Sequence, residues 1–127
     1  MKVFETSYAS IFIEKDLHLA KVVWKKTVPP LQFKLALDMI VQLVAKEEIK
    51  AVAEDQRRLF VVEGQIKHWL YRYYFPQVTT SLQHYLVVAS PRLGDSLLKN
   101  AGMPIQWIEN LNEAEWLLRQ KSAALRA

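Results

Sequence analysis

The chain has 127 residues and is 51% hydrophobic, with four tryptophans, a composition typical of one folded domain and unlike that of a disordered chain. It contains no cysteine, which excludes disulfides, thiol catalysis and thiolate metal sites and fits a cytoplasmic protein. The net charge of +4 comes from scattered basic residues, which argues against nucleic-acid binding, and no apolar run reaches the roughly 20 residues of a membrane span.

The N-terminal third of the chain predicts a hairpin followed by a helix. Residues 8–14 and 17–28 are rich in β-branched and aromatic side chains, which predicts two strands. Only Lys15 and Asp16 separate them, so the strands must pair antiparallel. Pro29 and Pro30 end the second strand and favour a helix over residues 30–46, where apolar side chains recur every three or four positions.

The central part predicts a strand, a charged turn and a second helix. Residues 49–54 form a short apolar strand, and its connection through the first helix predicts a right-handed crossover with parallel pairing. After a turn at residues 55–58, a helix over residues 62–75 should end at Pro76, because proline disfavours a helical residue before it. Residues 82–89 form a nearly unbroken apolar run, typical of a strand buried on both faces.

The C-terminal part predicts two helices around a short strand. Asp95 is placed to cap a short helix through Asn100, with Gly102 as its stop, and residues 105–108 predict the last strand. Asn112 is the predicted cap of the final helix. The order ββαβαβαβα predicts one α/β domain over residues 1–127, with its core at about 8–120 and a mixed four- to five-stranded sheet covered by helices.

The motifs of the common enzyme classes are missing from the sequence. The three glycines are too far apart for a phosphate-binding loop, the three histidines have no metal-ligand spacing, and no serine lies in a nucleophile elbow. We therefore predict no enzyme, no cofactor and no metal. One enzymatic alternative uses Asp55, His84 or Arg57, because Asp55 follows a parallel strand, where open α/β sheets place ligands.

The charged turn is the first candidate site, through Asp55, Arg57 and Arg58. Glu54 and Asp55 are adjacent in an extended segment and should point to opposite faces, so they are not expected to act as one acid/base pair. The alternative is a structural turn in which Asp55 pairs with an arginine or binds backbone N–H groups.

The helix over residues 62–75 carries more aromatic side chains than one face can hold. Trp69 and Tyr73 lie four residues apart, whereas Tyr71 and Phe75 lie on a face about 160° away. These rings either cover the sheet edge or form a dimer contact or an apolar pocket. Trp69, Tyr71, Tyr73 and Tyr74 are therefore candidate partner- or ligand-binding residues.

Several segments, taken in order, resemble those of a known family. VVWKKTV, AEDQRRL, YYFPQ, HYLVVASP and IQWIENLNEAEWLL occur in the order found in small bacterial single-domain proteins with the STAS fold, that of the anti-sigma-factor antagonists. The resemblance implies an α/β fold. From the missing catalytic motifs and the surplus aromatic side chains of the helix 62–75, we predict a non-enzymatic regulatory or protein-interaction domain that self-associates. The alternative, motivated by Trp69, Tyr73 and the apolar strand Leu86–Ala89, is a small apolar or lipid-like ligand held between the helix 62–75 and the sheet. The broader superfamily that this fold resembles includes lipid-binding domains.

The same resemblance implies one difference from the phosphorylated antagonists. In those proteins a serine follows the acidic residue after the third strand and starts the next helix, where a phosphate switches a partner. Here the turn reads Asp55-Gln56-Arg57-Arg58-Leu59, and residues 50–78 contain no serine or threonine. The expected domain therefore lacks this phosphorylation switch.

Overall fold

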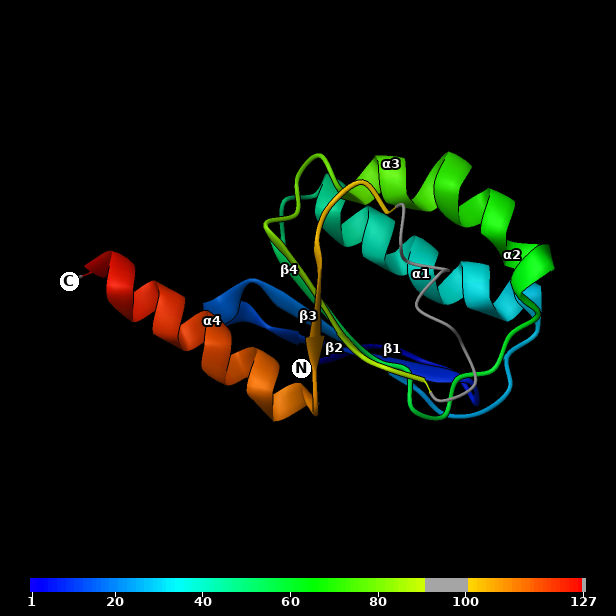
Figure 1. Cartoon of the computed structure of the whole chain (residues 1–127), viewed down its shortest axis with the longest axis horizontal. Helices are drawn as coiled ribbons and strands as arrows, with labels where there is room; N and C mark the ends of the chain where they lie inside the picture. Colours follow the sequence, from blue (N-terminus) through cyan, green and yellow to red (C-terminus); the bar gives the residue numbers. More distant parts are fainter. Residues whose placement is uncertain (91–100, 127) are drawn as a thin grey trace.

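A mixed six-stranded sheet forms the centre of the computed structural model, which describes residues 1–90 and 101–126 (Figure 1). The strands lie in the order β1-β2-β3-β4-β5-β6, with β1 to β3 antiparallel and β3 to β6 parallel. The elements are β1 (Lys2–Glu5), β2 (Ala9–Glu14), the 3-10 turn η1 (Lys15–Leu17), β3 (Leu19–Trp24), α1 (Pro30–Ala45), β4 (Ala51–Asp55), α2 (Glu63–Trp69), the π-helical turn η2 (Leu70–Tyr74), α3 (Phe75–Val78), β5 (His84–Val88), β6 (Ile105–Ile108) and α4 (Leu111–Arg126).

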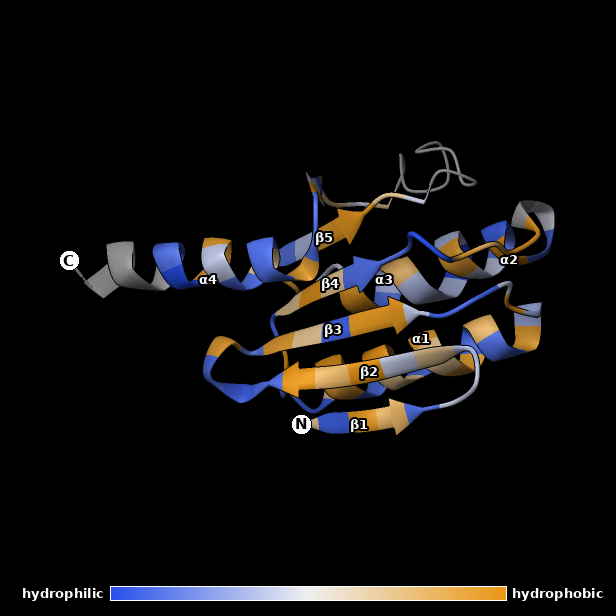
Figure 2. Cartoon of the chain, turned by 90° about the horizontal axis from the view of Figure 1, so that it is seen from below, coloured by the Kyte–Doolittle hydropathy of each residue, from blue (hydrophilic) through white to orange (hydrophobic). Residues whose placement is uncertain are grey.

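The sheet is covered unequally on its two faces. α1 and the continuous run α2–η2–α3 pack on one face, against side chains such as Ile11, Val52 and Val87. On the other face Ala114 and Leu118 of α4 pack on a smaller cluster that includes Ala53 and Leu86. In both views the last turns of α4 extend past the strands (Figure 2). Much of this second face, over β1, β2 and the end of β3, therefore lies outside the cluster that α4 covers.

The predicted α/β class is confirmed, and the predicted strand count is wrong by one. The additional strand is β1, which pairs with β2 at the edge of the sheet. Its two end residues, Lys2 and Glu5, are exposed, and its middle residues are half-buried. A four-residue edge strand of this kind has too little alternation to stand out in the sequence.

Two predicted helix boundaries are also corrected. The aromatic helix does not end at Pro76 but continues through α3 to Val78. A π turn precedes the proline, with the Phe75 N–H bonded to the Leu70 carbonyl, and Pro76 lies in the first turn of α3, where a missing N–H is tolerated. The final helix is capped by Asn110, not Asn112: the Glu113 N–H donates to Asn110 Oδ1 at 3.0 Å. The predicted helix over residues 95–100 lies outside the described residues.

No helix in residues 1–90 and 101–126 is long and apolar enough to cross a membrane.

Candidate functional site

The two adjacent carboxylates at the end of β4 enter different environments. Glu54 points toward the helices α1 and α2–η2–α3 and is 2% exposed. Asp55 points to the opposite face and binds the side chain of Arg57. The two groups do not form an acid/base pair, because alternate residues of a strand face opposite sides of the sheet. Each group therefore has to be considered with its own neighbours.

Glu54 is the centre of a buried polar network. Trp24 Nε1 donates to Glu54 Oε1 at 2.8 Å, and Gln56 Nε2 approaches the same oxygen at 3.4 Å. The Tyr85 hydroxyl donates to Glu54 Oε2, and the Tyr74 and Tyr85 hydroxyls lie 2.7 Å apart. No ion pair with a described residue compensates the carboxylate. The network joins β3, β4, β5 and the aromatic helix by hydrogen bonds, in addition to the packing of the Trp24, Tyr74 and Tyr85 rings in the core.

Burial raises the pKa of Glu54, and the hydrogen bonds from Tyr85, Trp24 and Gln56 offset only part of that rise. Burial and the nearby Glu54 carboxyl also raise the pKa values of Tyr74 and Tyr85 well above the usual range, so both phenols stay protonated. When Glu54 is ionised, it accepts a hydrogen bond from the Tyr85 hydroxyl, which accepts one from the Tyr74 hydroxyl. When Glu54 is protonated, the directions reverse: Glu54 donates to Tyr85, and Tyr85 donates to Tyr74. The Tyr74 hydroxyl hydrogen then lies at the end of the chain. The group therefore has two proton arrangements, and burial favours the neutral one.

Asp55 and Arg57 form the turn that follows β4. Arg57 Nε and Nη2 donate to the two Asp55 oxygens at 3.0 and 2.7 Å, and the Arg57 backbone N–H donates to Oδ1 at 3.1 Å. Partial burial by itself would raise the pKa of Asp55, but the Arg57 hydrogen bonds and charge outweigh it and lower that pKa. Asp55 therefore makes the arginine pair and the backbone N–H bond that the structural alternative expects. Arg58 is exposed and makes no ion pair with any described residue.

A surface depression of about 390 Å³ lies at this turn. Its walls come from the end of β3 and from the turn after β4, and its lining residues are Val23, Trp24, Lys25, Asp55, Arg57 and Arg58. All three predicted turn residues therefore contribute to one concave surface. Lys25 was not predicted as a site residue. Its position next to Trp24 at the end of a strand is the signal that could have identified it.

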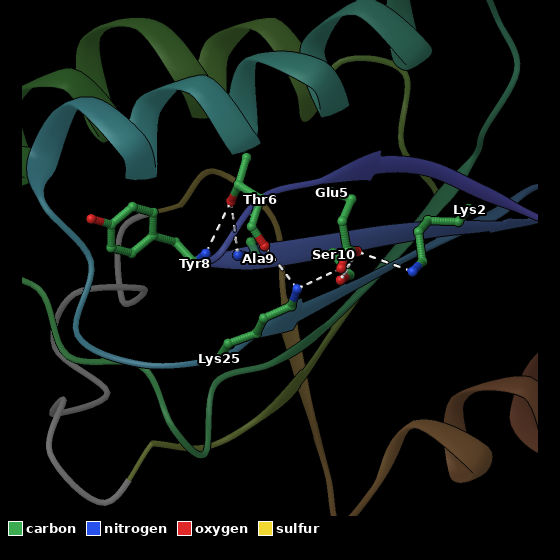
Figure 3. A network of polar contacts seen from close by, with 7 residues as sticks. All are labelled: Lys2, Glu5, Thr6, Tyr8, Ala9, Ser10 and Lys25. Carbon is green, nitrogen blue, oxygen red and sulfur yellow. Dashed lines mark hydrogen bonds and ion pairs between the residues drawn. The ribbon is translucent and has the colours of Figure 1, made fainter.

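Lys25 is held in place by the edge of the sheet (Figure 3). Its ammonium donates to Glu5 Oε1 at 2.8 Å and to the Thr6 carbonyl at 2.7 Å. Glu5 also accepts a hydrogen bond from Ser10 and pairs with Lys2 at 3.2 Å. Bonds from Lys25, Ser10 and Lys2 lower the pKa of Glu5 to about 2, so this carboxylate stays ionised and keeps Lys25 fixed.

The predicted aromatic residues are divided between the core and the surface. Tyr74 is fully buried, whereas Trp69 and Tyr71 are half-buried. Trp69 lies edge-on to Phe33 of α1 at 6.4 Å, and the Tyr73 hydroxyl donates to Asp38 of α1 at 2.7 Å. Helix α1 is therefore the second surface that these rings meet.

Aromatic rings fill the space between this helix and the sheet. Tyr74 and Phe75 both lie edge-on to Tyr85 of β5, with centroid distances of 6.4 and 6.2 Å. Within the described part of the chain, this packing gives no support to an apolar-ligand pocket at that place.

The structure does not bring together Asp55 and His84, two residues of the enzymatic alternative. His84 pairs with Ala51 at the start of β4, whereas Asp55 lies at its end. Four residues of a strand span about 13 Å, which is too far for direct proton transfer between these groups. His84 instead lies beside Lys121, and burial together with that lysine lowers the pKa of His84. No group of three or more metal-ligating side chains occurs among the residues that the structure describes.

Comparisons with known proteins identify the fold. No model of a known protein family matches the chain, and no curated protein matches it either. Among solved structures, the chain is similar to the anti-sigma factor antagonist SpoIIAA in its unphosphorylated form, with a TM-score of 0.64 and 8% sequence identity. The match covers 87% of this chain and 97% of SpoIIAA. The chain therefore has a STAS-like α/β fold.

Proposed function

We propose that this chain is a non-enzymatic regulatory domain that binds a partner protein at the end of the molecule where α1 and α2 begin. The observation that carries the proposal is the exposure of three large apolar side chains at this end: Leu31 at 65%, Phe60 at 38% and Val62 at 53%. The Val28 N–H donates to the Phe60 carbonyl at 2.8 Å, which joins the chain before α1 to the loop before α2. We call Leu31, Phe60 and Val62 the apolar end.

Charge and fold support the same proposal. Arg57 and Arg58 are exposed and lie in the chain just before Phe60, one of the three residues of the apolar end. Apolar side chains next to arginines are a composition enriched in protein interfaces. SpoIIAA, which has the same fold, is named as an antagonist of another protein. A domain with this arrangement acts by occupying a partner and not by transforming a substrate.

A cross-linking experiment tests the proposal. A photoreactive amino acid at Val62 of the full chain, expressed in its native cells, is expected to capture one partner that mass spectrometry identifies. The purified partner is then titrated with the chain by calorimetry. Leu31→Asp and Val62→Asp should each weaken binding at least about tenfold, because an unpaired charge would be buried in the contact. Trp116→Asp, at a side chain 60% exposed on α4, is the matched control and should bind like the wild type. A partner that binds all three variants equally would refute the proposal.

Self-association forms a second part of the proposal, carried by the edge strand β6. β6 is the last strand in the sheet order of the described residues, and Trp107 on it is 46% exposed. An exposed strand edge with an aromatic side chain is suited to pairing with a second copy. Sedimentation velocity should show a dimer that Trp107→Lys converts to a monomer. A wild-type chain that stays monomeric at high concentration would exclude this contact.

A further inference from the structure

Three cationic side chains line the depression at the turn after β4. Lys25 comes from the residue after β3, whereas Arg57 and Arg58 come from the turn itself. The depression lies at the carboxyl ends of two parallel strands, β3 and β4, where open α/β sheets bind their ligands. The position and the charge of this surface both suit an anion.

Two of the three cations are already oriented. Lys25 is fixed by Glu5 and by the Thr6 carbonyl, with its side chain 31% exposed. Arg57 is fixed by two hydrogen bonds to Asp55, and its side chain is 59% exposed. Side chains that are held before binding lose little conformational freedom when a ligand arrives. Arg58 makes no ion pair with a described residue, and its exposed side chain lines the same depression.

The charges of the depression leave an excess of positive charge. Three cations line it, Lys25, Arg57 and Arg58, against one carboxylate, Asp55, and the Glu5 that holds Lys25 is shared with Lys2. This excess suits an anion. A phosphate dianion would need more free donors, and no glycine lies in this turn to form a backbone phosphate cradle. A guanidinium also matches the two oxygens of a carboxylate in a forked geometry.

We propose that this depression receives a carboxylate side chain from an acidic segment of the partner protein, with Arg58 as its main donor and Lys25 and Arg57 as its flanks. The inference rests on the proposed function and names the chemistry of the partner. The partner's bound carboxylate lies beside the apolar end, and the apolar end binds the neighbouring side chains of the partner's acidic segment. Binding weakens as salt rises, because Arg58 is exposed to solvent.

A titration of the purified full chain tests the inference. The ¹⁵N-labelled chain is titrated with a blocked Asp-Glu-Asp-Glu peptide, with the neutral Asn-Gln-Asn-Gln peptide and with inorganic phosphate. The acidic peptide should shift the amide signals of Lys25, Arg57 and Arg58 to saturation, whereas the neutral peptide should not. Arg58→Gln should weaken the acidic peptide about threefold to fivefold, the loss expected for one exposed charge pair. Lys67→Gln, which removes an exposed cation of α2, is the matched control and should bind like the wild type.

Three results would overturn the inference. They are equal binding of the acidic and neutral peptides, equal binding of the acidic peptide by Arg58→Gln and the wild type, and tighter binding of phosphate than of the acidic peptide. The outcome is separable from that of the proposed function. If the peptide fails but the captured partner still depends on Leu31 and Val62, only the carboxylate site is wrong. If the peptide binds but no partner depends on those residues, the proposed function is wrong and the anion site stands.

Discussion

Replacing Glu54 by glutamine should change the pH dependence of stability more than stability itself. Glu54 is buried without an opposite charge among the described residues, and burial raises its pKa. Glutamine has nearly the same shape, keeps an oxygen for the Trp24 N–H and supplies an N–H to the Tyr85 hydroxyl. The substitution therefore removes one titration and preserves most of the packing.

The sign and the size of the effect follow from linkage. In the unfolded chain Glu54 titrates near its ordinary pKa of about 4.3. In the folded chain its pKa is higher, so above pH 4 the folded state binds more protons than the unfolded state, and stability falls as pH rises. The loss is about 1.4 kcal/mol for each pH unit between the two pKa values, and it levels off above the folded pKa. Glutamine carries no such loss.

The assay is urea unfolding followed by tryptophan fluorescence, for wild type and Glu54→Gln, between pH 4.5 and pH 8. Subtracting the two free energies of unfolding cancels the other titrating groups. The difference should move in favour of the variant with rising pH, at the slope given above, and then become constant. Glu48→Gln, at an exposed carboxyl outside this network, is the control for the change in charge. A difference that is independent of pH, or that favours the wild type as pH rises, would refute a raised pKa at Glu54.

Three further substitutions test other contacts. Asp55→Asn should lower the free energy of unfolding by about 1 kcal/mol, because it weakens the pair with Arg57. The pKa of Asp55 is lowered in the folded chain, so this stabilisation should disappear below about pH 4 as the carboxylate is protonated. Urea unfolding at several pH values measures both effects. Glu47→Gly should raise the free energy of unfolding by about 0.5–1 kcal/mol, because Glu47 has a left-handed φ of 59° after α1, whereas Glu48→Gly should give no gain. Leu118→Ala should lower the melting temperature through a loss of about 2–4 kcal/mol, whereas Trp116→Ala, at an exposed side chain, should change stability by less than about 0.5 kcal/mol. Equal effects at Leu118 and Trp116 would contradict the packing of α4.

The candidate site was predictable only in part. The turn with Asp55, Arg57 and Arg58 follows from the position of charged residues after an apolar strand, and these residues do line one depression. The position of Lys25 at a strand end is visible in the sequence, but its closeness to Asp55, 30 residues away, depends on the parallel pairing of β3 and β4. The sequence predicts that the aromatic rings lie on two faces of this helix, but which rings are buried depends on the π turn and on the packing of the helix.

The sequence by itself determined the order of the elements. Apolar periodicity, prolines and short links are local signals, and they predicted five of the six strands and the α/β class. Only the tertiary structure decided that β1 joins the sheet edge and that Glu54 lies among Trp24, Tyr85 and Tyr74. The physical reason is that burial, hydrogen-bond partners and pKa depend on residues distant in the chain. Periodicity shows that a side chain faces inward, but not what it meets there.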